Sequence, residues 1–362
     1  MKILIDIGHP AHVHMFRCFA NEMQNRGHMI LFTCRDKEFE VGLLSKYGFQ
    51  FVNFGKKSNT RIGKVFDLIQ FNWKEWKVAR QFRPDIFLSH GSIVASHIAW
   101  LLRKPSIAFE DTFNMEQIKI WEPFVSHILT SLYEHPLHSS KIIRYRGYNE
   151  LLYLHPNHFQ KDISIFKKLN IKKDKKYVVL RFVSWNATHD KGHKGISYEN
   201  KCKAVEEFSK YARVYISSEK TLPKELEKYR MPLPAEDMHA VMANACLIFG
   251  ESATMVAEGV MLGVPGVYID NTGRLYTNDI EKKYGLCFNY TESEEDQLGA
   301  IEKGVELIKK CSKEVVISRH QALLNDTIDV TAFLVWFVEN YPESVQQTRE
   351  NQKNDAFWAK FK

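Results

Sequence analysis

One stretch of the sequence decides the fold, and it reads Phe249-Gly250-Glu251-Ser252-Ala253-Thr254-Met255-Val256-Ala257-Glu258-Gly259-Val260-Met261-Leu262-Gly263-Val264-Pro265. Apolar residues lead into Gly250, small and hydroxyl residues follow it, and Gly263 and Pro265 stop the helix after it. A strand that turns directly into a helix is the repeating unit of a parallel α/β sheet. Backbone amides at the start of such a helix, here Ser252, Ala253 and Thr254, suit an anion.

The same alternation of short apolar runs and longer helical patterns occurs throughout the chain, in two series. It predicts parallel strands joined by right-handed helical crossovers. In the first series the expected strands are 2–7, 29–33, 49–54, 85–89, 106–109 and 127–130. In the second, the expected strands are 177–183, 214–217, 246–250 and 266–269, and the expected helices are 198–211, 235–244, 252–262 and 294–311.

A chain of 362 residues is long for one core, so two domains are expected. The polar, Gly- and Pro-containing connection places the boundary near residue 155, between a first domain at 1–155 and a second at 156–325. An apolar helix at 326–342 is expected to cross back onto the first domain. The remaining residues, 343–362, form a polar tail, which either frays or touches an apolar surface or a membrane.

Composition limits the classes of partner. A net charge of +7 suits anions such as nucleotide phosphates, but the basic residues form no block typical of nucleic-acid binding. The six cysteines are scattered without a Cys-x-x-Cys pair, so neither a metal site nor a redox pair is expected. No signal peptide or membrane span is evident, which predicts a cytoplasmic protein. The aromatic stretch 69–77 could meet the inner face of a membrane, although a packed amphipathic helix is the commoner meaning.

In the first half, polar residues follow several expected strands. His9 and His12 come after the first strand, where an imidazole can act as a general base; alternatively, one caps the next helix and the other packs. His90, Gly91 and Ser92 follow a later strand and are candidate ligand contacts.

Two carboxylates of the first half, Glu110 and Glu116, are candidates for acid or base chemistry or for binding sugar hydroxyls. They follow the expected strand 106–109. Helix capping by Asp111 or Thr112 is the alternative for this group.

In the second half, the polar loop after the strand 177–183 contains Asn186, His189, His193 and Lys194. Lysine charge, histidine donors and neighbouring glycines suit a diphosphate, and a solvated loop is the alternative. In the quoted stretch, Gly250, Glu251, Ser252, Ala253 and Thr254 form the expected anion site. Glu258 lies further along the helix, where a carboxylate can accept both ribose hydroxyls.

Three segments carry a resemblance to a known superfamily: Asp6-Ile7 leading to Pro10-Ala11-His12, then Trp185-Asn186-Ala187-Thr188-His189-Asp190, and Gly250-Glu251-Ser252-Ala253-Thr254. Over roughly residues 1–340 the chain resembles an uncharacterised bacterial and archaeal family of the GT-B superfamily. That superfamily includes nucleotide-sugar glycosyltransferases and non-hydrolysing UDP-N-acetylglucosamine 2-epimerases. The resemblance implies two Rossmann-like domains whose parallel sheets face an interdomain cleft, with the nucleotide sugar on the second domain and the acceptor on the first.

Residue by residue, the resemblance matches His90-Gly91-Ser92 to a His-Gly-Asp-Thr segment of the epimerases, Glu110 to a strand-end Glu and Glu116 to the first of a Glu pair. Ser252 and Glu258 fall on a nucleotide-binding Ser and the ribose-binding Glu. Ser92 stands where the epimerases have a catalytic Asp, which argues against epimerisation.

The expected function is therefore a glycosyltransferase that needs neither metal nor cofactor. It would transfer a sugar from a nucleotide donor, expected to be UDP-linked, to a cell-envelope glycan or a lipid-linked acceptor, with His12 as base. One alternative is a 2-epimerase or nucleotide-sugar hydrolase that uses Glu110 and Glu116. Another is a non-catalytic nucleotide-sugar-binding protein.

Overall fold

Strand β1 (Lys2–Ile7) is an apolar run broken by a single acid, Asp6, and it lies inside a parallel sheet with β2 on one side and β4 on the other. All of its residues from Ile3 onward are buried, as expected for a strand covered on both faces by helices. In this computed structural model the described residues are 1–36, 39–58, 60–183, 194–218, 221–310 and 313–362.

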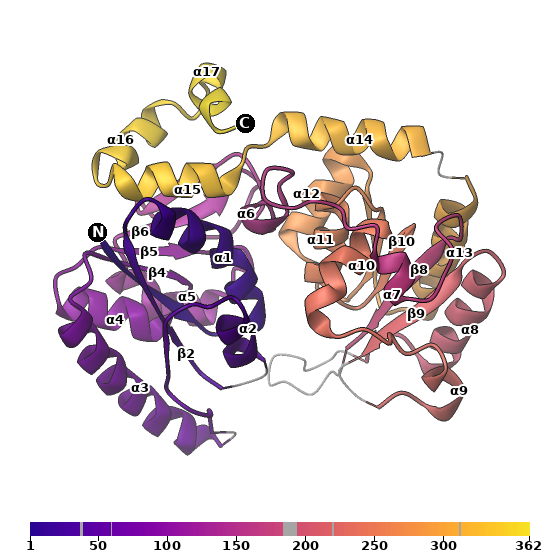
Figure 1. Cartoon of the computed structure of the whole chain (residues 1–362), viewed down its shortest axis with the longest axis horizontal. Coiled ribbons are helices and arrows are strands. Elements are labelled where there is room, and N and C mark those ends of the chain that lie inside the picture. Colours follow the sequence, from indigo (N-terminus) through magenta and orange to yellow (C-terminus); the bar gives the residue numbers. More distant parts are fainter. Residues whose placement is uncertain (37–38, 59, 184–193, 219–220, 311–312) are drawn as a thin grey trace. The chain divides into compact units, whose positions relative to one another are not determined.

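The chain folds into two units, and the first consists of Met1–Tyr153 together with Thr327–Lys362. Its seven strands are all parallel, in the order β3-β2-β1-β4-β5-β6-β7 (Figure 1). The strands after β1 are β2 (Met29–Cys34), β3 (Phe51–Asn53), β4 (Ile86–His90), β5 (Ser106–Phe109), β6 (His127–Ser131) and β7 (Ile142–Tyr145). The helices are α1 (Pro10–Asn25), α2 (Glu40–Lys46), α3 (Arg61–Phe82), α4 (Ile93–Leu101), α5 (Met115–Trp121), α6 (Leu151–Leu154), α15 (Val330–Glu339), α16 (Glu343–Glu350) and α17 (Asp355–Trp358), with 3-10 turns at Glu122–Phe124 and Ala359–Phe361.

The second unit is Leu154–Asp326, and its five parallel strands have the order β12-β11-β10-β8-β9. The strands are β8 (Tyr177–Phe182), β9 (Arg213–Ser218), β10 (Leu247–Gly250), β11 (Gly266–Ile269) and β12 (Cys287–Tyr290). The helices are α7 (Ile165–Lys168), α8 (Tyr198–Ser209), α9 (Lys224–Glu227), α10 (Met238–Asn244), α11 (Ala253–Met261), α12 (Leu275–Tyr284), α13 (Glu294–Lys310) and α14 (Lys313–Asp326), with a 3-10 turn at Ala235–Asp237.

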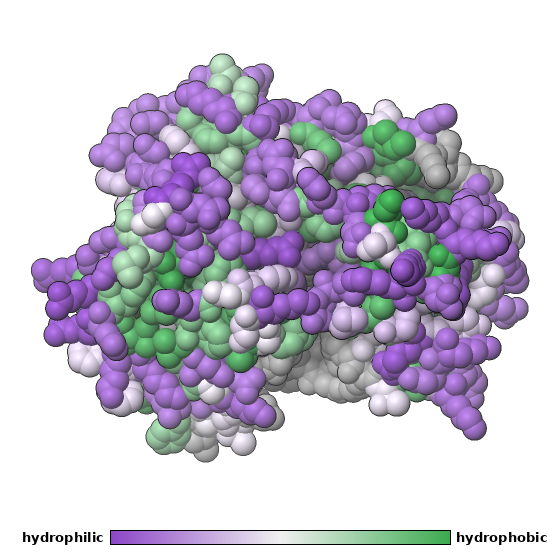
Figure 2. Space-filling model, viewed as in Figure 1, coloured by the Kyte–Doolittle hydropathy of each residue, from purple (hydrophilic) through white to green (hydrophobic). Residues whose placement is uncertain are grey.

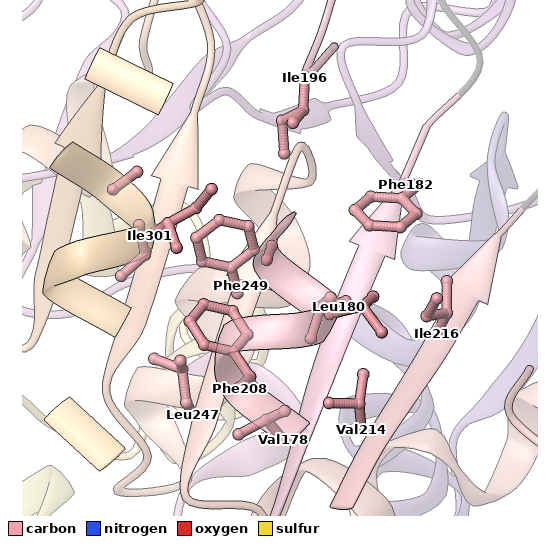
Figure 3. Close-up of a cluster of buried hydrophobic side chains, with 14 of the residues drawn as sticks. Val178, Leu180, Phe182, Ile196, Phe208, Val214, Ile216, Leu247, Phe249 and Ile301 are labelled. Carbon is pink, nitrogen blue, oxygen red and sulfur yellow. The ribbon is translucent and has the colours of Figure 1, made fainter. Parts of the chain in front are cut away.

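The core of the second unit is built where helices α8 and α13 cover the sheet. Phe208 of α8 packs edge-on against Phe249 of β10, with ring centroids 5.1 Å apart, and Ile301 of α13 joins the same cluster (Figure 3). Two glycines also bring α11 close to the sheet, because a Cβ on Gly259 would lie 2.5 Å from Ile248 of β10 and a Cβ on Gly266 of β11 would lie 2.5 Å from Val256 of α11. The polar residues are left mainly outside, and much of the surface in Figure 2 is hydrophilic.

The expected strands are confirmed, and the α/β class with two parallel sheets is as predicted. Strands β7 and β12 add one edge strand to each sheet. A polar residue interrupts each of them, Arg144 in β7 and Asn289 in β12, so neither is a continuous apolar run in the sequence.

The C-terminal residues differ from a frayed polar tail. Helices α16 and α17 belong to the first unit, and Phe357, Trp358 and Phe361 are buried. Trp358 and Phe361 each lie 5.5 Å, centroid to centroid, from the ring of Phe333 in α15. Burial of these aromatic side chains stabilises the ending of the chain, even though most of its residues are polar.

Candidate functional site

The strand order of each sheet marks where a ligand would bind. In the first unit the order reverses between β1 and β4, and in the second between β8 and β10. Ligands of open α/β sheets bind outside the carboxyl ends of the strands at such reversal points. The segments that start at Gly8 and Gly91 in the first unit, and at Glu251 in the second, are therefore at the expected positions.

At the end of β1, two histidines have defined roles. His9 is the N-cap of α1, and its Nδ1 accepts a hydrogen bond from the amide of Ala11 at 3.2 Å. His12 lies in the first turn of α1, and its Nδ1 accepts from the amide of Gly8 at 3.3 Å. A neutral His12 in this arrangement carries its proton on Nε2, so it presents a hydrogen-bond donor. Nδ1 is the nitrogen that could accept a proton, and it already accepts from Gly8. The predicted role of His12 as a general base therefore requires this hydrogen bond to break.

His90 forms a half-buried ion pair at the end of β4. Its ring stacks on that of His12, with centroids 4.7 Å apart, and its Nε2 lies 3.1 Å from Oδ1 of Asp111. Burial lowers the pKa of His90, but the Asp111 carboxylate outweighs burial and raises that pKa to about 9. Desolvation raises the pKa of Asp111, but the same pairing outweighs it and keeps that pKa below its ordinary value. His90 is therefore a cation at neutral pH.

Asp111 is held by further groups that sequence reasoning did not name. Its Oδ2 accepts from the side-chain amide of Asn149 at 2.5 Å, and the hydroxyl of Tyr145 donates to Asn149 Oδ1 at 2.5 Å. Asp111 does not cap α5, because Asn114 occupies the N-cap position. Helix capping by Asp111 or Thr112, the alternative for this group, is thus excluded.

Glu110 is buried beside the same histidine. Its Oε1 accepts hydrogen bonds from the amides of Thr112 and Phe113, at 2.8 and 2.7 Å. Burial raises the pKa of Glu110, and the charge of His90 partly opposes that shift. Gly91 has a φ of +54°, and a Cβ there would lie 3.4 Å from Glu110 Oε2, so the glycine leaves this oxygen room.

Ser92 is the N-cap of α4, as expected for a helix beginning there. Its hydroxyl donates to Oδ2 of Asp6, a buried acid at the end of β1. The other oxygen of Asp6 accepts from Thr33 at 2.9 Å and from the Arg35 guanidinium at 2.5 Å. The alcohol at position 92 is thus fixed by a carboxylate from a different strand.

Beneath Asp6 lies a second acid, Glu75 of α3, which is fully buried. Burial and the nearby charge of Asp6 raise the pKa of Glu75 to about 8, although Arg35 opposes the shift. Glu75 is therefore mostly protonated at neutral pH, and the cluster holds one negative and one positive charge, on Asp6 and Arg35. Such a balance avoids the large free-energy cost of an unpaired buried charge.

In the second unit, Gly250 forms the turn between β10 and α11. Its φ is +140°, and a Cβ at this position would lie 2.1 Å from the carbonyl oxygen of Arg181. Only glycine fits, since other residues rarely adopt this φ and have no space. Ser252 then caps α11 by accepting from the amide of Met255 at 3.3 Å. The amides of Ala253 and Thr254 therefore stand at the start of a nine-residue helix.

Glu251 has a structural role that differs from the predicted ligand contact. Its carboxylate accepts from the amides of Val183 at 2.7 Å and Ile196 at 2.6 Å, and Lys201 Nζ lies 3.2 Å away. These bonds join the end of β8 to the segment that leads into α8. A side chain with these partners, buried within the fold, stabilises the unit, so ligand contact by Glu251 stays a prediction.

Glu258 is buried on α11, and its Oε1 lies 3.0 Å from Nε2 of His239 on α10. This partner could not be predicted, because no pattern around His239 in the short helix α10 points to α11. The pairing orients the Glu258 carboxylate. Ribose binding by Glu258 stays a prediction.

Three of the predicted residues, Asn186, His189 and His193, lie outside the described residues. Lys194 is exposed, and its backbone amide donates to Glu292 at 2.6 Å. Glu116 is exposed in the first turn of α5, in contrast to buried Glu110. Within the described part of the chain, no three His, Cys, Asp or Glu side chains are grouped to hold a metal ion.

A further polar turn follows β11 at the same edge of the second sheet. Asp270 is buried, and its Oδ1 accepts from the amides of Thr272 and Gly273, at 2.7 and 2.9 Å. The polar residues Asp270 to Arg274 directly after an apolar strand were a sequence signal for this turn. It adds a fixed carboxylate and the guanidinium of Arg274 to that edge.

The sequence matches a family model over residues 1–311, and the chain belongs to that family, which is described as "Protein of unknown function (DUF354)". Among curated proteins, none matches the sequence.

Solved structures with the same fold are GT-B enzymes. The chain is similar to a UDP-bound MnaA from S. aureus, with 12% identity, a TM-score of 0.68, and coverage of 95% of this chain and 98% of that one. It is also similar to a UDP-GlcNAc 2-epimerase from Neisseria meningitidis bound to UDP-GlcNAc, with 16% identity, a TM-score of 0.65, and coverage of 87% of this chain and 94% of that one. A third similar structure is the spinosyn rhamnosyltransferase SpnG complexed with spinosyn aglycone, with 12% identity, a TM-score of 0.61, and coverage of 94% of this chain and 100% of that one. The fold is therefore GT-B, as the sequence predicted.

Proposed function

We propose that this protein is a nucleotide-sugar glycosyltransferase, with the donor bound by the second unit and the acceptor by the first. The observation that carries the proposal is the start of α11. There, a turn that only Gly250 fits leads directly to the amides of Ala253 and Thr254 at the reversal point of the sheet. Such amides, together with the helix dipole, bind a phosphate group.

Glu258 supports a nucleotide in preference to a simple phosphate. It lies on the same helix as the proposed phosphate site, is buried, and is oriented by His239. A fixed carboxylate can accept hydrogen bonds from two vicinal ribose hydroxyls. Several proteins of the same fold are described with uridine or thymidine diphosphate groups, which adds support for a pyrimidine nucleotide.

In the first unit, transfer needs a group that accepts a proton and a group that stabilises negative charge. Glu110 has an oxygen beside Gly91 and a raised pKa, which brings it nearer the working range of an acid or base. Cationic His90, with the ring of His12 stacked on it, would favour an anionic group. His12 and His9 remain the proposed base and its neighbour.

The test of donor binding is calorimetric titration with UDP and with UDP-GlcNAc. We expect binding to the wild-type chain and a loss of about tenfold or more in affinity for Glu258→Gln, which keeps the shape of the side chain but removes its charge. The control is Glu295→Gln, an exposed acid at the start of α13, which should bind as the wild type does. A wild-type chain that binds no uridine or other nucleotide would overturn the proposal.

A second function, 2-epimerisation, is distinguished by omitting any acceptor. The neighbouring 2-epimerases favour this function, whereas Ser92 opposes it, since its hydroxyl is bonded to Asp6 and the resemblance places a catalytic aspartate there. If the protein forms a 2-epimer from UDP-GlcNAc alone, its function is epimerisation and the proposed sugar transfer is wrong. Sugar transfer only when a glycan or lipid-linked acceptor is present would support the proposal.

A further inference from the structure

Helix α3 of the first unit has apolar side chains on two faces, and only one of them is covered. Phe71 and Ala79 are buried against the sheet and α4. On the other face, Val65, Phe66, Ile69 and Trp73 are 60, 68, 63 and 53% exposed. We call these four residues the α3 stripe. The stretch 69–77 was expected either to pack or to meet a membrane, and the structure divides its aromatic residues between the two faces.

The α3 stripe is continuous. Positions 65, 69 and 73 are four residues apart and 66 adjoins the first of them, so their side chains share one face of the helix. With a rise of about 1.5 Å per residue the stripe is about 12 Å long. Figure 1 shows α3 at the lower left of the view, at the outer edge of its unit. Some hydrophobic residues are visible in the lower left part of Figure 2.

The exposed charges around the α3 stripe are mostly positive. The exposed cations on and next to the helix are Lys56, Lys57, Lys77, Arg80 and Arg83. Of the two acids in the helix, Glu75 is buried and Asp67 is half-buried, and Asp85 beside Arg83 is exposed, so the exposed cations outnumber the exposed acids. Lys77 Nζ lies 3.6 Å from the ring centroid of Trp73, which places a cation beside the most aromatic part of the stripe.

We propose that the α3 stripe docks the first unit onto the surface of a bilayer that contains anionic phospholipid. Apolar side chains of such a helix enter the boundary between headgroups and acyl chains, while the flanking cations contact lipid phosphates. Attachment is at the surface, since no helix of the described residues is long and apolar enough to span a membrane. The inference concerns a surface and does not depend on the proposed sugar transfer.

The charges favour a bilayer over a second copy of the chain. A symmetric dimer through the α3 stripe would bring the same patch of both copies together. The cations of one copy would then face those of the other, and like charges repel. An anionic lipid surface attracts the same cations and accepts the same apolar side chains.

The test is co-sedimentation of the full chain with vesicles of phosphatidylcholine mixed with phosphatidylglycerol, compared with vesicles of phosphatidylcholine alone. We expect the wild type to bind the mixed vesicles and salt to weaken that binding. The triple variant Phe66→Ser, Ile69→Ser, Trp73→Ser should bind at least about tenfold more weakly, because it removes most of the apolar surface that enters the lipid. The double variant Lys77→Glu, Arg80→Glu should lose the preference for phosphatidylglycerol.

The matched control is Ile163→Ser with Ile317→Ser, which removes two apolar side chains that are 54 and 64% exposed in the second unit. It should bind vesicles as the wild type does. Equal melting temperatures of the variants and the wild type verify that the fold is unchanged. Equal vesicle binding by the triple variant, or no binding by the wild type, would overturn the proposal. So would light scattering that shows a wild-type dimer which the triple variant makes monomeric without any vesicle binding.

Discussion

The carboxyl edges of the two sheets are built from different chemistry. At the reversal point of the first unit, charged side chains pair with one another: His90 with Asp111, and Arg35 with Asp6. At the reversal point of the second unit, Glu251 bonds backbone amides of its own unit as well as pairing with Lys201, and a glycine turn leads into the start of a helix. The first edge is suited to proton transfer and the second to binding an anion through the backbone.

The difference also shows how each edge is fixed. The second edge depends on backbone geometry, so a single methyl group can disrupt it. The first depends on balanced buried charges, so its properties change with protonation. Three predictions test whether backbone geometry fixes the second edge and whether charged side chains fix the first.

The largest effect is expected for Gly250→Ala. The added Cβ would lie 2.1 Å from the Arg181 carbonyl oxygen, at a φ of +140° that alanine rarely adopts. We expect a loss of about 3 kcal/mol or more in the free energy of unfolding, measured by denaturant titration. Gly42→Ala in α2 is the control, because a Cβ there meets no atom within 4 Å and alanine favours a helix. If the two variants are equally stable, the turn at the carboxyl edge of the second sheet does not require glycine at position 250.

The next effect concerns the charge of His90. In the wild type we expect the His90 ring to titrate near pH 9, as followed by NMR of the imidazole. Asp111→Asn removes the carboxylate that contributes most to raising this pKa and leaves the desolvation that lowers it, so the pKa should fall well below 9, even though the Glu110 carboxylate still raises it.

A matched control for His90 is Glu116→Gln, because Glu116 is exposed in α5. This variant should leave the titration of His90 unchanged. A His90 pKa that is the same in wild type and Asp111→Asn would show that the ion pair does not set the charge of the first edge.

The smallest effect is expected for Glu75→Gln. The folded-state pKa of Glu75, about 8, is above the ordinary value of 4.5, so the folded chain holds a proton that the unfolded chain releases between these values. Stability from this group is therefore fully present below about pH 4.5 and is lost as pH rises through about 8.

Glutamine cannot lose that proton. Relative to the wild type, Glu75→Gln should therefore gain stability as pH rises from about 4.5 to about 8. Denaturant titrations of both proteins across this range measure the difference, and the contribution of His90 cancels because both contain it. A constant difference at all pH values would mean that Glu75 is already ionised in the folded protein.

The sequence by itself determined the fold class, because apolar strands and amphipathic helices have periods that are visible without any long-range information. It also located the turn at Gly250, the helix starts at Ser92 and Ser252, and the histidines after β1, since these features depend on neighbouring residues. Edge strands β7 and β12 were not predicted, because a polar residue interrupts the apolar pattern of each.

Only the tertiary structure decided which polar residues are partners. Ser92 meets Asp6 across 86 positions of sequence, Glu251 meets Val183 across 68, and Glu258 meets His239 on another helix. It also decided which face of α3 is covered, because both faces are apolar and the sequence pattern alone cannot choose between them. Local propensity sets where strands and helices begin, whereas strand order sets which of their ends meet, and these polar residues lie at those ends.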